Sequence, residues 1–257
     1  MTPFLTLFRR EIARFLKVIV QTIITPFVSS FLYLLIFGVS LGSTMPSHQG
    51  VSYLAFLIPG LMMMGLMNNA FQNSSSSIVS SKFSGDLEDL RVAPVSNPEI
   101  IWAMGLGALV RGFLVSVITF TVGSIFCWYQ QGAVLGIAHP IYTLYFIVMG
   151  GMIFGLLGIS VAFWATSFDQ LSAFSAFILL PLTYLGGVFL SIENLHPVWR
   201  MISRLNPLLY LINGLRYGVI GVSDVPMEVA VPVSLLGFIV FYFLAMFSLR
   251  RGSFQRW

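Results

Sequence analysis

The sequence predicts an all-α integral membrane protein with six transmembrane helices, an N-terminal amphipathic interfacial helix and a re-entrant helical hairpin before the last span. Two observations support this class. Hydrophobic residues make up 57 % of the 257 residues and charged residues only 9 %, so a water-soluble fold would expose too much apolar surface. The charged residues are also confined to short segments, which leaves long uncharged stretches able to cross a bilayer.

Residues 1–17 are expected to form the interfacial helix. Apolar side chains recur at helical spacing at Phe4, Phe8, Ile12 and Phe15, and four basic residues occupy the other side. This pattern is typical of an amphipathic helix that lies in the membrane interface. The uncharged run that follows is too long for the apolar core of a cleavable signal peptide, so we expect this first apolar segment to be retained.

Long uncharged stretches define the spans, because a membrane-crossing helix needs about 20 mostly apolar residues. Two stretches are long enough for two spans each and two shorter ones hold one span each; they are residues 18–81 and 112–168, then 170–192 and 229–249. Loops are expected at residues 42–50 and 129–140. Six spans place both ends of the chain on the same side of the membrane.

The third span has a long apolar lead-in that Arg111 interrupts. We expect residues 99–110 to lie along or enter the membrane interface, and residues 112–128 to form the crossing helix. Arg111 is expected to reach the headgroups or to pair with a carboxylate on a neighbouring element. An interfacial anchor is favoured over a substrate site.

The basic residues predict the orientation of the chain. Ten of the 13 lie on the side of the termini, namely Arg9, Arg10, Arg14, Lys17, Lys82, Arg91, Arg111, Arg250, Arg251 and Arg256. The other three are Arg200, Arg204 and Arg216. Because cytoplasmic segments carry an excess of Lys and Arg, the N and C termini and the segment around Lys82 are expected to be cytoplasmic.

Residues 82–98 form the most highly charged loop. Its charged residues within the first ten positions are Lys82, Asp86, Glu88, Asp89 and Arg91. Gly85, followed by acidic residues, indicates the start of a short helix. Leu87, Leu90 and Val92 can share one side of that helix and form an apolar ridge suited to a groove on another protein. A merely solvated loop is the alternative.

The second span carries polar residues in the half that approaches this loop. They are Asn68, Asn69, Gln72 and Asn73, followed by serines at 74–77, 80 and 81. Polar groups are costly against lipid, so this half should face protein or water. Interhelical hydrogen bonding is favoured over a transport path. In the fourth span, Gly151, Gly155 and Gly158 predict a close helix contact.

The fifth span is expected to break near its outer end, at Pro181 and at Gly186-Gly187. Residues 194–220 then contain two amphipathic pieces that are each too short to cross the membrane and that meet at Asn206-Pro207. Such pieces predict a re-entrant hairpin with three arginines at its polar edge.

We interpret this hairpin as an outer gate, with Asn206-Pro207 as a rigid corner. Arg216 needs a partner at this depth, and Glu193 is the simplest choice. A latch between Arg216 and Glu193 should affect gating but not folding. Arg216→Ala is therefore expected to assemble normally and to show a raised basal leak of substrate or raised ATPase activity.

Several activities are excluded by what the sequence lacks. It has no G-x-x-x-x-G-K-[ST] motif, so the chain is not expected to bind ATP. No acidic residue or histidine lies deep in a span, and no catalytic set or metal-ligand spacing occurs. The net charge of +4 comes from few groups and is interpreted as topological rather than as a nucleic-acid surface. No catalytic, cofactor or metal residue is therefore proposed.

The runs PLTYLGGVF, SIENLHPVW and LNPLLYLINGLRYG, together with KFSGDLEDLRVAPVSNPEI, YLAFLIPGLMMM and GVSDVPM, resemble the ABC-2-type permeases. These proteins are the membrane subunits of type V ATP-binding-cassette exporters, and the resemblance is to their YadH-like bacterial inner-membrane group. It covers almost the whole chain, so residues 1–257 are treated as one transmembrane domain.

The resemblance implies a homodimer of six-span subunits bound to two separate ATPase subunits, which would hold the ATP and Mg²⁺. It also implies that Lys82–Arg91 is the coupling helix on the ATPase, with Gly85–Arg91 as the coupling residues, that residues 2–17 are the interfacial helix and that 194–220 cap the path. The alternative is a self-contained secondary carrier or membrane scaffold without an ATPase partner. The sequence names no cargo.

Overall fold

The computed structural model describes residues 3–40, 42, 50–87 and 93–252, and the regular elements within them are helices. They are α1 (Pro3–Leu16), α2 (Ile19–Tyr33), the π-helical η1 (Leu34–Ser40), α3 (Tyr53–Ser84), α5 (Asn97–Gln131), α6 (Pro140–Trp164), α7 (Phe168–Phe174), the π-helical η2 (Ser175–Leu179), α8 (Leu180–Leu185), the short 3₁₀ helix η3 (Ile192–Asn194), α9 (Pro197–Leu205), α10 (Pro207–Ile220) and α11 (Met227–Arg251).

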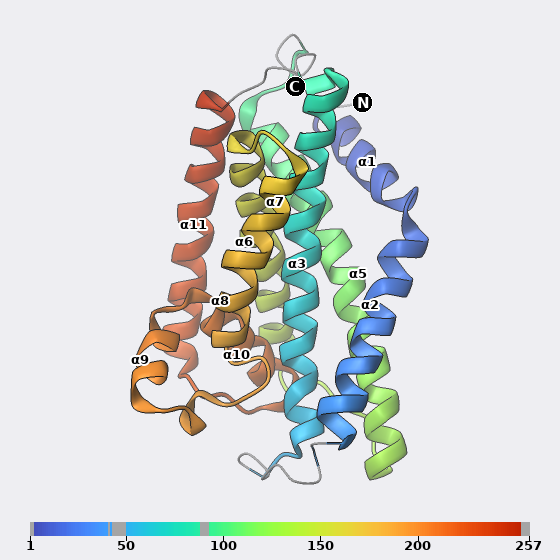
Figure 1. Ribbon diagram of the computed structural model, residues 1–257, viewed down its shortest axis with the longest axis vertical. Coiled ribbons are helices and arrows are strands. Elements are labelled where there is room, and N and C mark those ends of the chain that lie inside the picture. The colour runs from blue at the N-terminus through green and yellow to red at the C-terminus, as the bar shows by residue number, and fades with distance from the viewer. Residues whose placement is uncertain (1–2, 41, 43–49, 88–92, 253–257) are drawn as a thin grey trace.

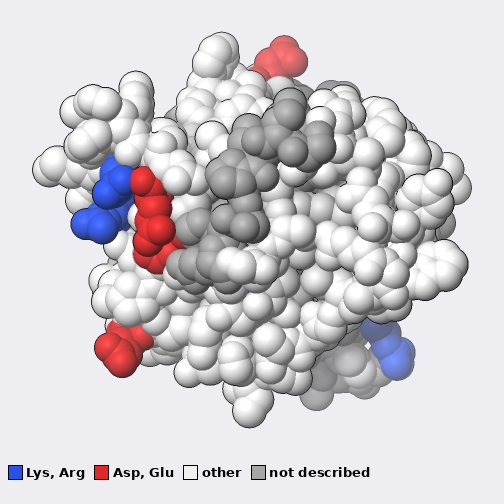
Figure 2. Space-filling view, turned by 90° about the horizontal axis from the view of Figure 1, so that it is seen from below, with Lys and Arg blue, Asp and Glu red and all other residues white. Residues whose placement is uncertain are grey.

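The six predicted spans are confirmed. Within the described residues, six helical stretches are long and apolar enough to cross a membrane: Ile19–Ser40, Tyr53–Ser84, Asn97–Gln131, Pro140–Trp164, Phe168–Leu185 and Met227–Arg251. They run along the long axis of the molecule, with both termini at one end and α9 and α10 toward the other (Figure 1). Seen from that second end, most described atoms are uncharged, and Lys and Arg atoms appear only in small areas near the edge (Figure 2).

The third span differs from the expectation, because α5 is one continuous helix from Asn97 to Gln131. Ser96 and Glu99 start it with a capping box, in which the Ser96 backbone N–H and Oγ donate to Glu99 Oε2 at 2.8 and 2.7 Å. Most side chains from Ile100 to Ala108 are buried against neighbouring helices. Close packing at a glycine contributes to this burial: a Cβ on Gly107 would lie 2.7 Å from Glu11 Cβ on α1.

Helices α3 and α6 form the centre of the bundle, and the predicted glycine contact lies between α6 and its neighbours. A Cβ on Gly151 would meet Leu109 Cδ1 on α5 at 2.5 Å, and one on Gly158 would meet the carbonyl oxygen of Phe71 on α3 at 2.5 Å. Both helices are mostly buried, whereas α2, α7–α8 and α11 expose many apolar side chains. These outer helices therefore present apolar surface to lipid or to another protein.

The fifth span ends at the predicted Gly186-Gly187, whereas Pro181 lies inside its helical stretch Phe168–Leu185 and changes the helix type beside it. Pro181 cannot donate a backbone hydrogen bond and crowds the carbonyl four residues earlier, and the π-helical stretch Ser175–Leu179 stands directly before it. Helix α8 ends at Leu185, and Gly187 adopts a left-handed φ of 82° that turns the chain. This turn leads into η3 and then into α9 and α10.

Candidate functional site

The outer turn of the fifth span is bound by Arg216 on α10. Its Nη2 donates to the carbonyl oxygen of Gly187 at 2.7 Å, and its Nε donates to that of Phe56 on α3 at 3.3 Å. Its Nη1 donates to Asn213 Oδ1 at 3.1 Å, and the guanidinium carbon lies 3.7 Å from the centre of the Phe56 ring. Arg216 is 0 % exposed, so it joins three segments inside the molecule rather than lying at a polar edge.

The expected latch between Arg216 and Glu193 is not formed. The guanidinium bonds to backbone carbonyls because the end of α8 leaves acceptors unsatisfied, and arginine supplies five donors. Asp224 is the acid that acts on Arg216 electrostatically, while burial lowers the pKa of Arg216 to about 10. The Asp224 carboxylate also accepts hydrogen bonds from Ser191 Oγ at 2.8 Å and from the Ile192 N–H at 3.0 Å.

The backbone of Glu193 has a different partner, Arg200 on α9. Arg200 donates to the carbonyl oxygen of Glu193 and, from Nε, to that of Ile192 at 3.2 Å. These bonds join α9 to η3. Of the three arginines predicted at the hairpin's polar edge, Arg204 is exposed and Arg216 is buried.

Asn206 and Pro207 form the predicted corner between α9 and α10. The Asn206 side-chain Oδ1 accepts from the Leu208 N–H at 3.0 Å and caps α10, whose first residue is Pro207. Its Nδ2 donates to the carbonyl oxygen of Leu182 on α8 at 2.6 Å. The corner is therefore bonded to the same broken helix that Arg216 contacts.

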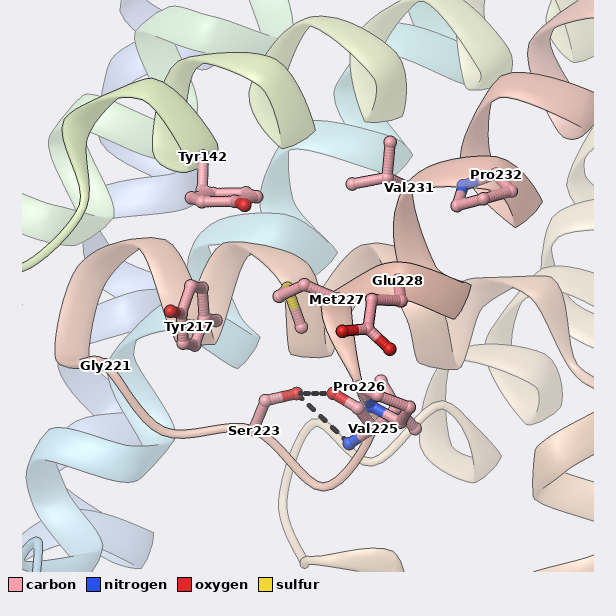
Figure 3. A pocket seen from close by; sticks show the side chains of 10 residues that line it. All are labelled: Tyr142, Tyr217, Gly221, Ser223, Val225, Pro226, Met227, Glu228, Val231 and Pro232. Atoms are coloured by element: carbon pink, nitrogen blue, oxygen red, sulfur yellow. Dashed lines mark hydrogen bonds between the residues drawn. The ribbon is translucent and has the colours of Figure 1, made fainter.

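An open pocket of about 860 Å³ lies beside this region, between the first turn of α6, the end of α10 and the start of α11. Tyr142 and Tyr217 form one side of it, Met227 lies between, and the Glu228 carboxylate lies on the other side (Figure 3). Ser223 Oγ donates to the carbonyl oxygen of Val225 at 2.7 Å in the loop below. The pocket therefore has two tyrosine rings and the Glu228 carboxylate in its lining.

At the opposite end, a buried polar cluster joins α1 to α3. Glu11 is 0 % exposed; its Oε2 lies 3.3 Å from Arg14 Nη2, and its Oε1 accepts from Ser77 Oγ at 2.7 Å. Arg14 also donates to the Asn73 carbonyl oxygen and to Asn73 Oδ1. Burial lowers the pKa of Arg14, and the charge of Glu11 partly opposes that shift. Asn73 and the nearby serine therefore make interhelical hydrogen bonds, as predicted.

The other polar residues of the second span have a different place. Asn68, Asn69 and Gln72 line a groove of about 440 Å³ between α2, α3 and α5, with Arg111 in its wall. Asn69 Nδ2 donates to the carbonyl oxygen of Gly65 in its own helix at 3.0 Å. Of the four polar residues predicted in this span, Asn73 therefore contacts α1, and Asn68, Asn69 and Gln72 line the groove.

The proposed ATPase-coupling segment is described only in part: Gly85, Asp86 and Leu87 are described, and Glu88, Asp89, Leu90 and Arg91 lie outside the described residues. Gly85 ends α3 with a left-handed φ of 87°, and residues 86 and 87 are helical. Leu87 is 1 % exposed and belongs to the chain's own core with residues such as Ile78 and Ile101. The expectation that it forms an outward ridge is wrong, because the buried first turns of α5 contribute to the core that covers it.

Two buried charged residues were missed by the sequence reasoning, Glu11 and Lys82. Lys82 Nζ donates to the carbonyl oxygens of Ala162, Phe163 and Ala165 at 2.8, 2.9 and 3.1 Å. It therefore caps the end of α6. One signal was present: Lys82 is the first charged residue after a long uncharged run, at the point where the second span reaches the end of the bundle.

A helical bundle with six candidate spans and polar cavities between its helices is typical of a polytopic membrane transport protein. Residues 2–220 match the model of the ABC-2 type transporter family, and the chain belongs to that family. It is 35 % identical over 247 residues to the inner membrane transport permease YadH of Escherichia coli strain K12, across 96 % of this chain and 94 % of the relative.

More distant relatives align over nearly the same extent. Nodulation protein J of Neorhizobium galegae is 25 % identical over 256 residues, across 96 % of this chain and 92 % of the relative. Nodulation protein J of Rhizobium meliloti is 22 % identical over 253 residues, again across 96 % and 92 %. The alignments therefore extend from α1 to α11.

Proposed function

We propose that the chain is the membrane-spanning permease subunit of an ATP-binding-cassette exporter in a bacterial inner membrane. It works as a homodimer with two separate ATPase subunits, which bind ATP and Mg²⁺. The observation that carries this proposal is the ABC-2 family match over residues 2–220, supported by the likeness to a protein named as an inner membrane transport permease. The exposed apolar faces of α2, α7–α8 and α11 offer surface for a second copy as well as for lipid.

We place the ATPase contact at the end of the bundle that carries the termini. There Phe83, in the last turn of α3, is 65 % exposed and stands two residues before Gly85. Exposed aromatic side chains are frequent anchors of protein interfaces. Leu87, buried in the core, positions the coupling segment on the bundle, and Phe83 together with residues 85–91 contacts the partner.

The coupling proposal is tested by co-expressing the chain with any ABC ATPase subunit that is encoded beside its gene and isolating the complex. Phe83→Ala is expected to weaken binding of the ATPase subunit at least roughly tenfold, because an interface anchor contributes about 2 kcal/mol or more. Tyr129→Ala is the matched control, since Tyr129 is an aromatic residue that is 85 % exposed in the last turn of α5, at the other end of the bundle. A wild-type chain that never co-purifies with an ATPase would support the self-contained carrier instead.

Both termini are proposed to be cytoplasmic and the hairpin of α9 and α10 to lie outside. In a Cys127→Ser background, Gln131→Cys is expected to react with a membrane-impermeant thiol reagent in intact cells. Ser84→Cys is expected to react only after permeabilisation, because it lies with the termini. The measurement is the labelled fraction of each cysteine variant by mass spectrometry. Labelling of Ser84→Cys but not Gln131→Cys in intact cells would reverse the orientation inferred from the basic residues.

The outer gate remains part of the proposal, in a form that the contacts suggest. Arg216 and Asn206 bond the hairpin to the carbonyl oxygens of Gly187 and Leu182. The hairpin and the broken end of the fifth span would then move together as one closure, with Gly186-Gly187 as its flexible turn. Glu193 belongs to η3 and Pro207 to the corner between α9 and α10, so both residues help to fix the geometry of this closure.

A further inference from the structure

The groove between α2, α3 and α5 has a polar face inside a membrane-spanning segment. Gln21, Thr25 and Ser29 line it from α2 at spacings of four residues, so one face of the helix supplies all three. All three are exposed in the chain, although polar side chains facing lipid are costly. Ser30 and Thr119, which share a hydrogen bond of 2.8 Å, join α2 to α5 in the groove wall. This face requires water or a polar occupant.

The groove is polar at one end and apolar at the other. On α3 its lining changes from Leu61 and Met64 to Asn68, Asn69 and Gln72 toward the end of the molecule that carries the termini. A helix rises 1.5 Å per residue, so the distance from Leu61 to Gln72 is roughly 16 Å. That length fits a compact headgroup followed by several methylene groups.

Arg111 brings a positive charge to the polar end. It lies in the middle of α5, and its side-chain Nε is buried without a hydrogen-bond partner. Within the described part of the chain, no carboxylate lies within ion-pair distance of it. Charged residues in membrane spans normally pair with an opposite charge or reach a water-filled cavity. Arg111 is therefore a cation available to a ligand.

The neighbouring charges do not neutralise Arg111. Arg14 acts on it as a like charge, and Arg10 and Arg14 both share the single carboxylate of Glu11. Among these described residues, three guanidinium groups and one carboxylate leave two positive charges. The surroundings thus favour an anion over a cation or a neutral group.

We propose that this groove binds an anionic amphiphile. Its phosphate, sulfate or carboxylate headgroup accepts hydrogen bonds from the Arg111 guanidinium, whose planar donors match such oxygens. Asn68 and Gln72 hydrogen-bond the remaining headgroup oxygens, and the apolar part extends along Met64, Leu61 and Tyr33. The proposal rests on the chain being a transport protein and specifies the chemical class of molecule that this part of it accepts.

The test measures binding to the purified permease in detergent, without ATPase or ATP. The probes are fluorescent lysophosphatidic acid and a fluorescent monoacylglycerol with the same acyl chain, followed by fluorescence anisotropy. Arg111→Gln is expected to weaken binding of the anionic probe about 10- to 100-fold, because charge-assisted hydrogen bonds are lost. Binding of the neutral probe should be unchanged. Arg111→Lys should lose less affinity for the anionic probe, since lysine keeps the positive charge but not the planar set of donors.

Two further variants keep the test decisive. Arg250→Gln, at the exposed end of α11, makes the same charge change away from the groove and should bind like the wild type. Thr25→Trp leaves Arg111 intact but fills the groove from an exposed position, and should weaken both probes even if Arg111→Gln fails to fold. Loss of ATPase co-purification in Phe83→Ala with normal probe binding would separate the coupling proposal from this one.

Three results would overturn the inference. Equal affinity of the wild type for the anionic and neutral probes would remove the role of charge. Unchanged binding by Arg111→Gln would leave Arg111 as an interfacial anchor. Competition by inorganic phosphate as strong as that by unlabelled lysophosphatidic acid would show that the site takes a free anion and not an amphiphile.

Discussion

Replacing Arg216 with alanine is expected to destabilise the folded permease by about 3–5 kcal/mol, because it removes several hydrogen bonds of a buried side chain at once. The substitution leaves the carbonyl oxygens of Gly187 and Phe56 without this donor in the interior, and each such loss costs about 1–3 kcal/mol. It also removes the contact between the guanidinium and the Phe56 ring. The measurement is thermal unfolding of the purified protein, with a fall in Tm of roughly 10 °C.

Matched variants distinguish a structural role from gating. Arg204→Ala, on the exposed side of α9, should change Tm little, because isolated surface substitutions stay within about 0.5 kcal/mol. Arg216→Lys should be intermediate, since a single ammonium group cannot reproduce the planar donor geometry. A normal Tm for Arg216→Ala together with substrate leak would contradict the structural role and indicate that Arg216 acts in gating.

Replacing Lys82 with alanine is expected to destabilise the end of the bundle that carries the termini by about 2–5 kcal/mol. Its ammonium group donates to three carbonyl oxygens at the end of α6, and the side chain is 0 % exposed. Truncation leaves these acceptors unsatisfied and a cavity beside them. Because Lys82 lies five residues before Leu87, the coupling segment should also loosen, which lowers ATPase co-purification along with Tm.

Lys82→Met separates the two causes, since methionine fills much of the volume but donates no hydrogen bond. Lys82→Met should therefore avoid the loss of stability caused by the cavity, but still lose the stability that the hydrogen bonds to the three carbonyl oxygens provide. Lys17→Ala, at an exposed position after α1, is the control for loss of a basic residue at this end. A Lys82→Ala protein with wild-type Tm and normal ATPase binding would show that water replaces the ammonium at no cost.

The sequence by itself determined the membrane class, the six spans, the glycine contact of α6 and the corner at Asn206-Pro207. Each depends on a local signal. Charged residues are excluded from hydrocarbon, so uncharged stretches mark spans. Proline removes a backbone donor and glycine permits close approach or a left-handed φ, so their positions mark breaks and contacts wherever they occur.

Only the tertiary structure decided where the charged side chains lie. Arg216 bonds to Phe56, 160 residues away, and Lys82 bonds to Ala162, 80 residues away. Leu87 packs inward because buried residues of the first turns of α5, such as Ile101, contribute to the core around it. A charge or polar group is tolerated in an interior only where the fold brings enough acceptors around it. That condition joins segments far apart in the chain, so no spacing within the sequence could reveal it.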